Sequence, residues 1–165
     1  ITSVPDKAAE TVRALVEMDK YDLIFLDLPG TVNAEGILYT LSKMDYIFCP
    51  ISADRVVLES SLRFASRINE KLIVSGKSNI KGLHLVWNLV DGREKTELYE
   101  VYEQVIAELG LDVLKTFLPD SKRFRRELSA GHRPLFRSTM FPADRALIKG
   151  SNLDALAEEI IDIIK

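Results

Sequence analysis

The chain has 165 residues, of which 47% are hydrophobic and 28% charged, and this fits one globular domain with a single core. The formal net charge of -3 argues against a general polyanion binder, although a local basic patch is compatible with it. Cys49 is the only cysteine, so no disulfide forms within the chain and a reduced, cytoplasmic protein is expected. No apolar run reaches the roughly 18 residues that span a bilayer, so no membrane partner is expected.

An N-terminal helix is expected first, opened by a capping box at Ser3 and Asp6. The next element is a strand over residues 21–27. Its central residues have no polar alternation, which predicts a strand buried on both faces of a parallel sheet. Ligands of such sheets bind at the carboxyl ends of the strands, where Asp27 is expected, so the pattern favours a magnesium-side carboxylate. The alternative is that Asp27 only caps a loop.

Helices and strands then alternate to the end of the chain. In order they are a helix over 33–43, a strand over 46–51, a long helix capped by Asp54, a strand over 82–90, a helix over 94–109 stopped by Gly110, a strand over 113–118 and an amphipathic helix over 152–164. This alternation predicts an α/β fold with a largely parallel sheet flanked by helices.

Four motifs in this order resemble the ParA/MinD group of partitioning ATPases, which carry a deviant phosphate loop. They are Asp27-Leu28-Pro29 after an apolar strand, the run from Met44 to Pro50, Asn88 on a later strand, and Leu118-Pro119-Asp120-Ser121. The resemblance runs from about Tyr21 to the C-terminus and is nearest to ParA-like, TraA-type proteins of plasmids and conjugative transposons. It implies a P-loop NTPase (SIMIBI-like) fold and an ATPase for DNA partitioning, segregation or conjugative transfer.

The resemblance also implies roles for individual residues. Asp27 matches the acidic residue that orients a magnesium-bound water, and Gly30 matches the switch whose amide senses the γ-phosphate of ATP. Asn88 falls where the family places an amide against the adenine edge, a task that suits a carboxamide because it offers donor and acceptor together. Pro119 and Asp120 match the loop that closes over the base. On the plainer alternative, Asn88 finishes a strand and Pro119 stops one.

The family's glycine-rich phosphate loop has no counterpart before Asp27, because residues 1–20 contain no glycine. Residues 1–165 are therefore expected to form a single domain, the C-terminal part of a ParA-like ATPase, and to be inactive alone. Gly76-Lys77-Ser78 matches only the end of the loop motif and lies between a helix and a strand, so it is interpreted as a solvated loop. The family's phosphate-loop strand lies beside the strand over 21–27, so its absence predicts self-association through an open sheet edge.

A basic stretch over residues 121–137 contrasts with the acidic average of the chain. Its cations are Lys122, Arg123, Arg125, Arg126, Arg133 and Arg137. In a ParA-like protein such a patch can contact DNA phosphates without sequence preference, with an affinity that falls as salt rises. The alternative is a solvated loop and helix face.

The resemblance further implies a homodimer that closes around ATP and Mg²⁺ and opens on hydrolysis, with nonspecific DNA and a ParB-like stimulating protein as partners. Two alternatives stay open. One is a synthase of the same superfamily, similar to dethiobiotin synthetase. The other belongs to a different class: a non-catalytic α/β interaction module that keeps the scaffold without nucleotide chemistry.

Overall fold

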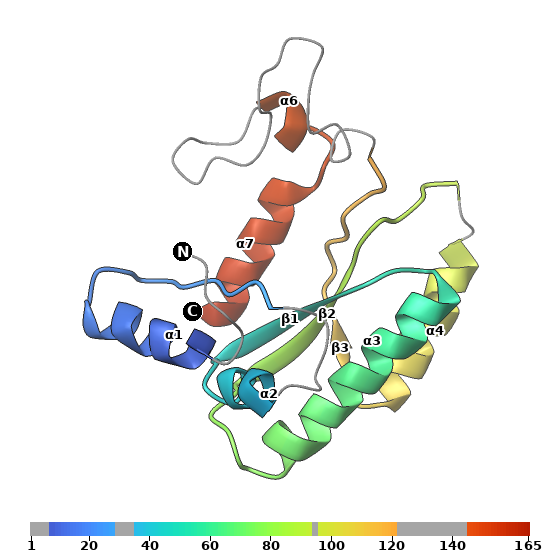
Figure 1. The fold of residues 1–165 in the computed structure, drawn as a ribbon. Helices are drawn as coiled ribbons and strands as arrows, with labels where there is room; N and C mark the ends of the chain where they lie inside the picture. Colours follow the sequence, from blue (N-terminus) through green and yellow to red (C-terminus); the bar gives the residue numbers. More distant parts are fainter. Residues whose placement is uncertain (1–6, 29–34, 94–95, 122–144) are drawn as a thin grey trace. The chain divides into compact units, whose positions relative to one another are not determined.

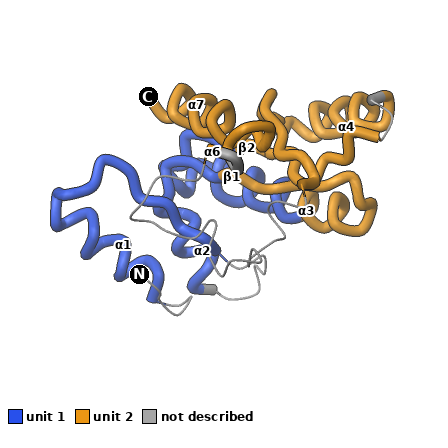
Figure 2. Tube along the Cα trace, turned by 90° about the horizontal axis from the view of Figure 1, so that it is seen from above, with its two compact units in different colours: residues 1–47, 64–83 blue, residues 48–63, 84–165 orange. Residues whose placement is uncertain are grey.

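The computed structural model describes residues 7–28, 35–93, 96–121 and 145–165 (Figure 1). The chain divides into two compact units, which Figure 2 draws in different colours. Unit 1 comprises residues 1–47 and 64–83, and unit 2 comprises residues 48–63 and 84–165. Three elements contribute to both units: strand β1 (Tyr46–Ile51), helix α3 (Arg55–Ile68) and strand β2 (Gly82–Trp87).

The sheet of the described chain has three strands in the order β1-β2-β3, where β3 is Asp112–Val113. The N–H of Lys81 donates to the carbonyl of Asp45, and the N–H of Asn88 donates to the carbonyl of Ile51, both at 2.7 Å. Because both residue numbers rise together, β1 and β2 run parallel. β2 and β3 are parallel as well. The predicted α/β class, with a parallel sheet flanked by helices, is therefore confirmed.

Unit 1 is built from helices around the first residues of β1 and β2. Helix α1 (Ala8–Glu17) packs against α2 (Glu35–Leu41), and α3 continues into a π-helix, η2 (Asn69–Val74). The predicted capping box of the first helix lies outside the described residues. The core side chains of this unit are Ile37, Leu41, Ile47, Ala65, Ile68, Ile80 and Leu83.

Residues 21–28 do not form a strand, and the prediction of a buried strand there is wrong. Tyr21, Leu23 and Phe25 are 55%, 45% and 70% exposed, whereas the alternate residues from 24 to 28 are half-buried. The segment is therefore extended with one face covered. An apolar run predicts burial, but it does not distinguish a strand that is hydrogen-bonded within a sheet from an extended segment that packs outside one.

Unit 2 has its core where β2 meets helix α4 (Thr96–Glu108). Trp87 is 3% exposed, its ring contacts that of Tyr99 edge-on with the centroids 4.9 Å apart, and its Nε1–H donates to Oε1 of Glu103 at 2.8 Å. α4 ends as predicted at Gly110, whose φ of +69° is the left-handed conformation that glycine adopts without strain. Ile106 of α4 is fully buried.

One helix start in unit 2 follows its predicted signal. Asp54 caps α3, because its Oδ1 accepts the N–H groups of Val56 and Val57, both at 3.0 Å. The predicted C-terminal helix is α7 (Leu153–Ile164), which is preceded by the short helix α6 (Arg145–Ile148). Asn152 precedes α7 and donates from Nδ2 to the carbonyl of Phe117 at 2.9 Å, which ties the start of α7 to the chain after β3.

Strand β3 is shorter than the predicted strand over 113–118. Beyond Val113, the N–H of Leu114 donates to the carbonyl of Leu85 and the N–H of Leu118 donates to the carbonyl of Trp87, both at 2.8 Å. The acceptors are two residues apart, whereas the donors are four residues apart. Two extra residues therefore bulge from the chain after β3.

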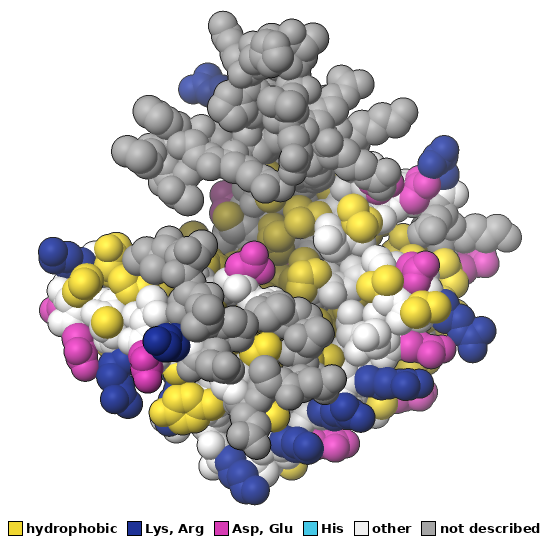
Figure 3. Space-filling model, viewed as in Figure 1, with side chains coloured by type: hydrophobic (Ala, Val, Ile, Leu, Met, Phe, Trp, Pro, Cys, Tyr) yellow, Lys and Arg dark blue, Asp and Glu magenta, His cyan; other side chains and the backbone are white. Residues whose placement is uncertain are grey.

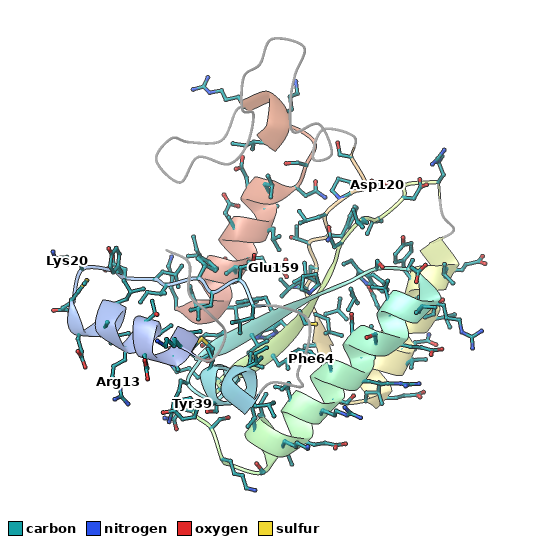
Figure 4. All side chains as sticks on the ribbon, in the orientation of Figure 1. Arg13, Lys20, Tyr39, Phe64, Asp120 and Glu159 are labelled. Atoms are coloured by element: carbon teal, nitrogen blue, oxygen red, sulfur yellow. The ribbon has the colours of Figure 1, made fainter. Side chains whose placement is uncertain are left out.

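A carboxylate from the last helix accepts the backbone N–H groups of this bulge. The N–H groups of Lys115 and Thr116 donate to Oε1 and Oε2 of Glu159, both at 2.8 Å. Figure 4 labels Glu159 on α7. Hydrophobic pattern alone did not predict this, because a strand and a bulge share the same apolar residues and differ only in what accepts their N–H groups.

Glu159→Gln is expected to lower the free energy of unfolding by about 1 kcal/mol near neutral pH, because a neutral amide has one acceptor oxygen for two N–H donors. Burial alone would raise the pKa of Glu159, but hydrogen bonds from Thr116 and Lys115 outweigh it and lower this pKa. The stabilisation is therefore present above the unfolded-state pKa and is lost as the pH falls through the folded-state pKa. Urea denaturation near neutral pH and at about pH 3 should show the difference between wild type and variant shrinking in acid.

The control for this prediction is Glu158→Gln, which removes the same charge from an exposed neighbour on α7. Its stability should stay close to that of the wild type. Equal losses in the two variants would contradict a specific role for Glu159.

Candidate functional site

The predicted base-binding residues meet at the carboxyl edge of β2 and β3, within unit 2. Val90 and Pro119 form a parallel bridge: the N–H of Val90 donates to the carbonyl of Leu118 at 3.0 Å, and the N–H of Asp120 donates to the carbonyl of Val90 at 2.9 Å. Asn88 directly follows the last residue of β2. Two distant motifs of the sequence are thus brought side by side, with Asp120 exposed at this edge (Figure 4).

The backbone reaches this bridge through a second irregularity, at Leu89. Its φ is +58°, a conformation that costs a residue with a side chain roughly 1–2 kcal/mol. Residues 84 and 85 pair with partners 28 positions further along the chain, and Val90 pairs with one 29 positions further. The chain after β3 has already gained two residues, and Leu89, which follows β2, is one extra residue on the opposite side that takes back one of these two. Bulges of this kind are common beside binding sites.

The side chain of Asn88 is held by this turn. Its Oδ1 accepts the N–H of Leu89 at 2.9 Å, and its own backbone N–H is bonded to β1. An amide oxygen has two lone pairs and the amide nitrogen has two hydrogens. The group is therefore oriented and keeps the donor and acceptor capacity that pairing with a nucleobase edge requires.

An ion pair that the sequence analysis missed lies in the same turn. Arg93 binds the carboxylate of Asp91 through two side-chain nitrogens, with Nε 2.9 Å from Oδ1 and Nη2 2.6 Å from Oδ2. Its backbone N–H also donates to Oδ1, at 3.0 Å. The side-chain hydrogen bond from Arg93 is the largest cause that lowers the pKa of Asp91 to about 2. The local signal was an acidic and a basic residue flanking Gly92, a common turn composition.

Asp120 adds a second carboxylate to this edge. Its charge contributes to raising the pKa of Arg93, although the bonds from Asp91 contribute more. The edge thus presents one amide, one guanidinium and two carboxylates. Such groups can read the polar edge of a base and accept a hydrogen bond from a hydroxyl or amino group.

The other predicted site residues are placed differently. Asp27 belongs to unit 1 and is exposed in the segment 21–28, so the site is described for unit 2 alone. Gly30 lies outside the described residues, as do the six cations predicted to contact DNA, from Lys122 to Arg137. Those assignments stay predictions.

Among the described residues, no three His, Cys, Asp or Glu side chains gather as a metal site. Mg²⁺ is usually held by one or two carboxylates and several waters, so a single Asp27 acting through water does not require such a cluster. Burial raises the pKa of Cys49 to about 11, which keeps its thiol protonated. No described helix is both long and apolar enough to cross a membrane.

Arg93→Gln is expected to raise the pKa of Asp91 from about 2 toward its ordinary value of 3.8. Because the folded-state pKa is lowered, the contribution of this pair to stability is present above the unfolded-state pKa and disappears as the pH falls toward 2. An NMR titration of the Asp91 carboxyl carbon measures the pKa of Asp91 in the wild type and in the variant. Arg55→Gln, which removes an exposed arginine paired with Glu59, is the control and should leave the pKa of Asp91 unchanged. A wild-type Asp91 that titrates near its ordinary value would refute this pairing.

Comparison with known proteins does not assign a family. No protein-family model matches the chain, and no curated protein matches it either. The resemblance to the ParA/MinD group therefore rests on the four motifs and stays a prediction.

Proposed function

We propose that this chain belongs to a ParA-like, nucleotide-dependent ATPase that acts in DNA partitioning, segregation or conjugative transfer. The observation that carries the proposal is the meeting of Asn88, Pro119 and Asp120 at one carboxyl edge of a parallel sheet. Ligands of parallel α/β sheets bind at such edges. The resemblance named these residues for contact with the adenine base, and their proximity in unit 2 supports that role.

In this proposal each residue has a distinct task. Asn88 pairs with the adenine edge, and its hydrogen bond to the N–H of Leu89 keeps the amide oriented. The ring of Pro119 offers apolar surface to the base, and the exposed carboxylate of Asp120 accepts a hydrogen bond from an amino or hydroxyl group. Bound ATP with Mg²⁺ supplies the phosphoryl chemistry. Asp27 would hold the Mg²⁺ through water, and two protomers would close on the nucleotide.

A second candidate function is a non-catalytic α/β interaction module. The observation that favours it is the segment 21–28, which is extended and half-exposed where a buried strand was expected to hold Asp27. A catalytic carboxylate needs a fixed position, and an exposed segment outside the sheet provides less restraint than a central strand. The two candidates differ in whether ATP is bound and hydrolysed.

Asp27→Asn is expected to lower ATP hydrolysis by the complete gene product at least a hundredfold, because an amide is a poor substitute for a carboxylate that orients a water. Steady-state phosphate release with Mg²⁺ measures this, with the 165-residue chain assayed beside it and expected to be inactive. Asp22→Asn, in the same exposed segment, is the matched control and should keep normal turnover. Near-normal turnover in Asp27→Asn would remove the catalytic assignment, and no hydrolysis by either wild-type form would favour the interaction module.

Asn88→Ala in the complete gene product is expected to weaken ATP binding about tenfold and to leave GTP binding unchanged, since about one hydrogen bond to adenine is lost. Calorimetric titration with each nucleotide and Mg²⁺ tests the base site separately from hydrolysis. Asn79→Ala, an exposed asparagine in unit 1, is the control and should leave both affinities unchanged. Unchanged ATP affinity in Asn88→Ala would place the base elsewhere.

A further inference from the structure

Helix α4 carries an exposed apolar stripe on one flank, beside the side that packs on the sheet. Its members recur at intervals of three and four residues, which places them on one side of a helix. They are Leu98, Val101, Val105 and, directly after the last helical residue, Leu109, with exposed fractions of 38%, 55%, 43% and 45%. Four large apolar side chains in register form a continuous surface, unlike the single exposed residues that are common on proteins.

The sheet is covered by a different side of α4. Ile106 is fully buried, and Tyr99 packs against Trp87. With 3.6 residues per turn, the centre of the stripe lies about a quarter turn from the centre of this inner side. The apolar surface of α4 thus extends beyond the side that packs on the sheet, and 38–55% of each stripe residue stays exposed.

The stripe is bordered by acidic residues. α4 has the sequence TELYEVYEQVIAE, with four glutamates and no lysine or arginine. Glu97 lies one turn before Val101, and Glu108 lies one turn after Val105, so both carboxylates are neighbours of the stripe. Figure 3 shows hydrophobic, acidic and basic side chains interspersed on the right of the view, over α3 and α4.

The acidic border of the stripe favours one kind of binding partner over another. A second copy that paired its α4 with this one would bring two acidic borders together, which is unfavourable. A partner with cations beside an apolar stripe would satisfy both features. An amphipathic helix has this form, because it presents apolar anchors at intervals of three and four and carries its charges at the border.

We propose that this exposed flank of α4 binds a basic amphipathic helix of a partner protein. The apolar residues of that helix cover Leu98, Val101, Val105 and Leu109, and its lysines or arginines meet Glu97 and Glu108. The site is separate from the proposed nucleotide edge, so nucleotide binding and this interaction are tested independently.

The probe is a fluorescently labelled, 18-residue helical peptide of leucine and lysine with one apolar face, and its charge-reversed counterpart has glutamate in place of lysine. Fluorescence anisotropy with the 165-residue chain should show binding of the lysine peptide and none of the glutamate peptide. The double variant Val101→Ser/Val105→Ser keeps every charge and should weaken binding at least tenfold. Both positions are exposed, so the variant should fold, which circular dichroism checks.

The charge requirement is tested by Glu97→Gln/Glu108→Gln, which should weaken binding severalfold at low salt. Glu10→Gln/Glu17→Gln removes the same charge from exposed positions of α1 and is the control, with wild-type affinity expected. Equal affinity of the lysine peptide for wild type and Val101→Ser/Val105→Ser would overturn the proposal.

Sedimentation of the free protein tests whether a second copy of the chain covers the stripe instead. A wild-type chain that does not associate through α4, together with stripe-dependent peptide binding, supports the partner helix. A wild-type dimer that Val101→Ser/Val105→Ser converts to a monomer would show instead that a second copy covers the face, and would overturn the proposal.

Discussion

The two backbone hydrogen bonds to the Glu159 carboxylate shape the edge of the sheet where the candidate site lies. Backbone N–H groups need acceptors, and the chain after β3 takes two of its acceptors from α7 in place of β2. This allows two extra residues to bulge out before Leu118 returns to the ladder at Trp87. The bulge determines which residues then face Val90, so a side chain of the last helix sets the position of Pro119 and Asp120.

The backbone after β2 is irregular as well, and its irregularity matches the bulge after β3. Leu89 adopts a left-handed conformation that a leucine rarely takes, and it is the extra residue that brings Val90 into the bridge with Pro119. The surrounding turn holds this conformation through local bonds, from Leu89 to the Asn88 side chain and from Arg93 to Asp91. Strain at one residue is thus offset by short-range hydrogen bonds, which is the usual way in which a protein maintains an irregular backbone at a binding edge.

The two proposed surfaces of unit 2 differ in their physical character. The carboxyl edge of β2 and β3 is polar, with an oriented amide and carboxylates that suit a small polar ligand. The exposed flank of α4 is apolar with an acidic border, which suits a helix of opposite charge. Both depend on Trp87 and its contacts with Tyr99 and Glu103, because these fix α4 against the strand from which the polar edge extends.

The amino-acid sequence by itself determined the elements whose signals are local. The bounds of β1, the cap at Asp54, the stop at Gly110 and the amphipathic helix α7 each follow from residues within a few positions of one another. Motif order also singled out Asn88, Pro119 and Asp120, which the folded chain brings to one edge. These features were predictable because capping, glycine conformation and helical periodicity depend on neighbours in the chain.

Only the tertiary structure decided which apolar segments pair in the sheet. Residues 21–28 and the chain after Val113 have the composition of strands, yet the first lies outside the sheet and the second leaves it for two residues. The physical reason is that pairing depends on distant acceptors: Glu159 lies 44 positions after Lys115. The hydrophobic pattern of a sequence predicts which side chains are buried. The hydrogen-bond partner of each backbone N–H, in contrast, depends on the tertiary structure as a whole.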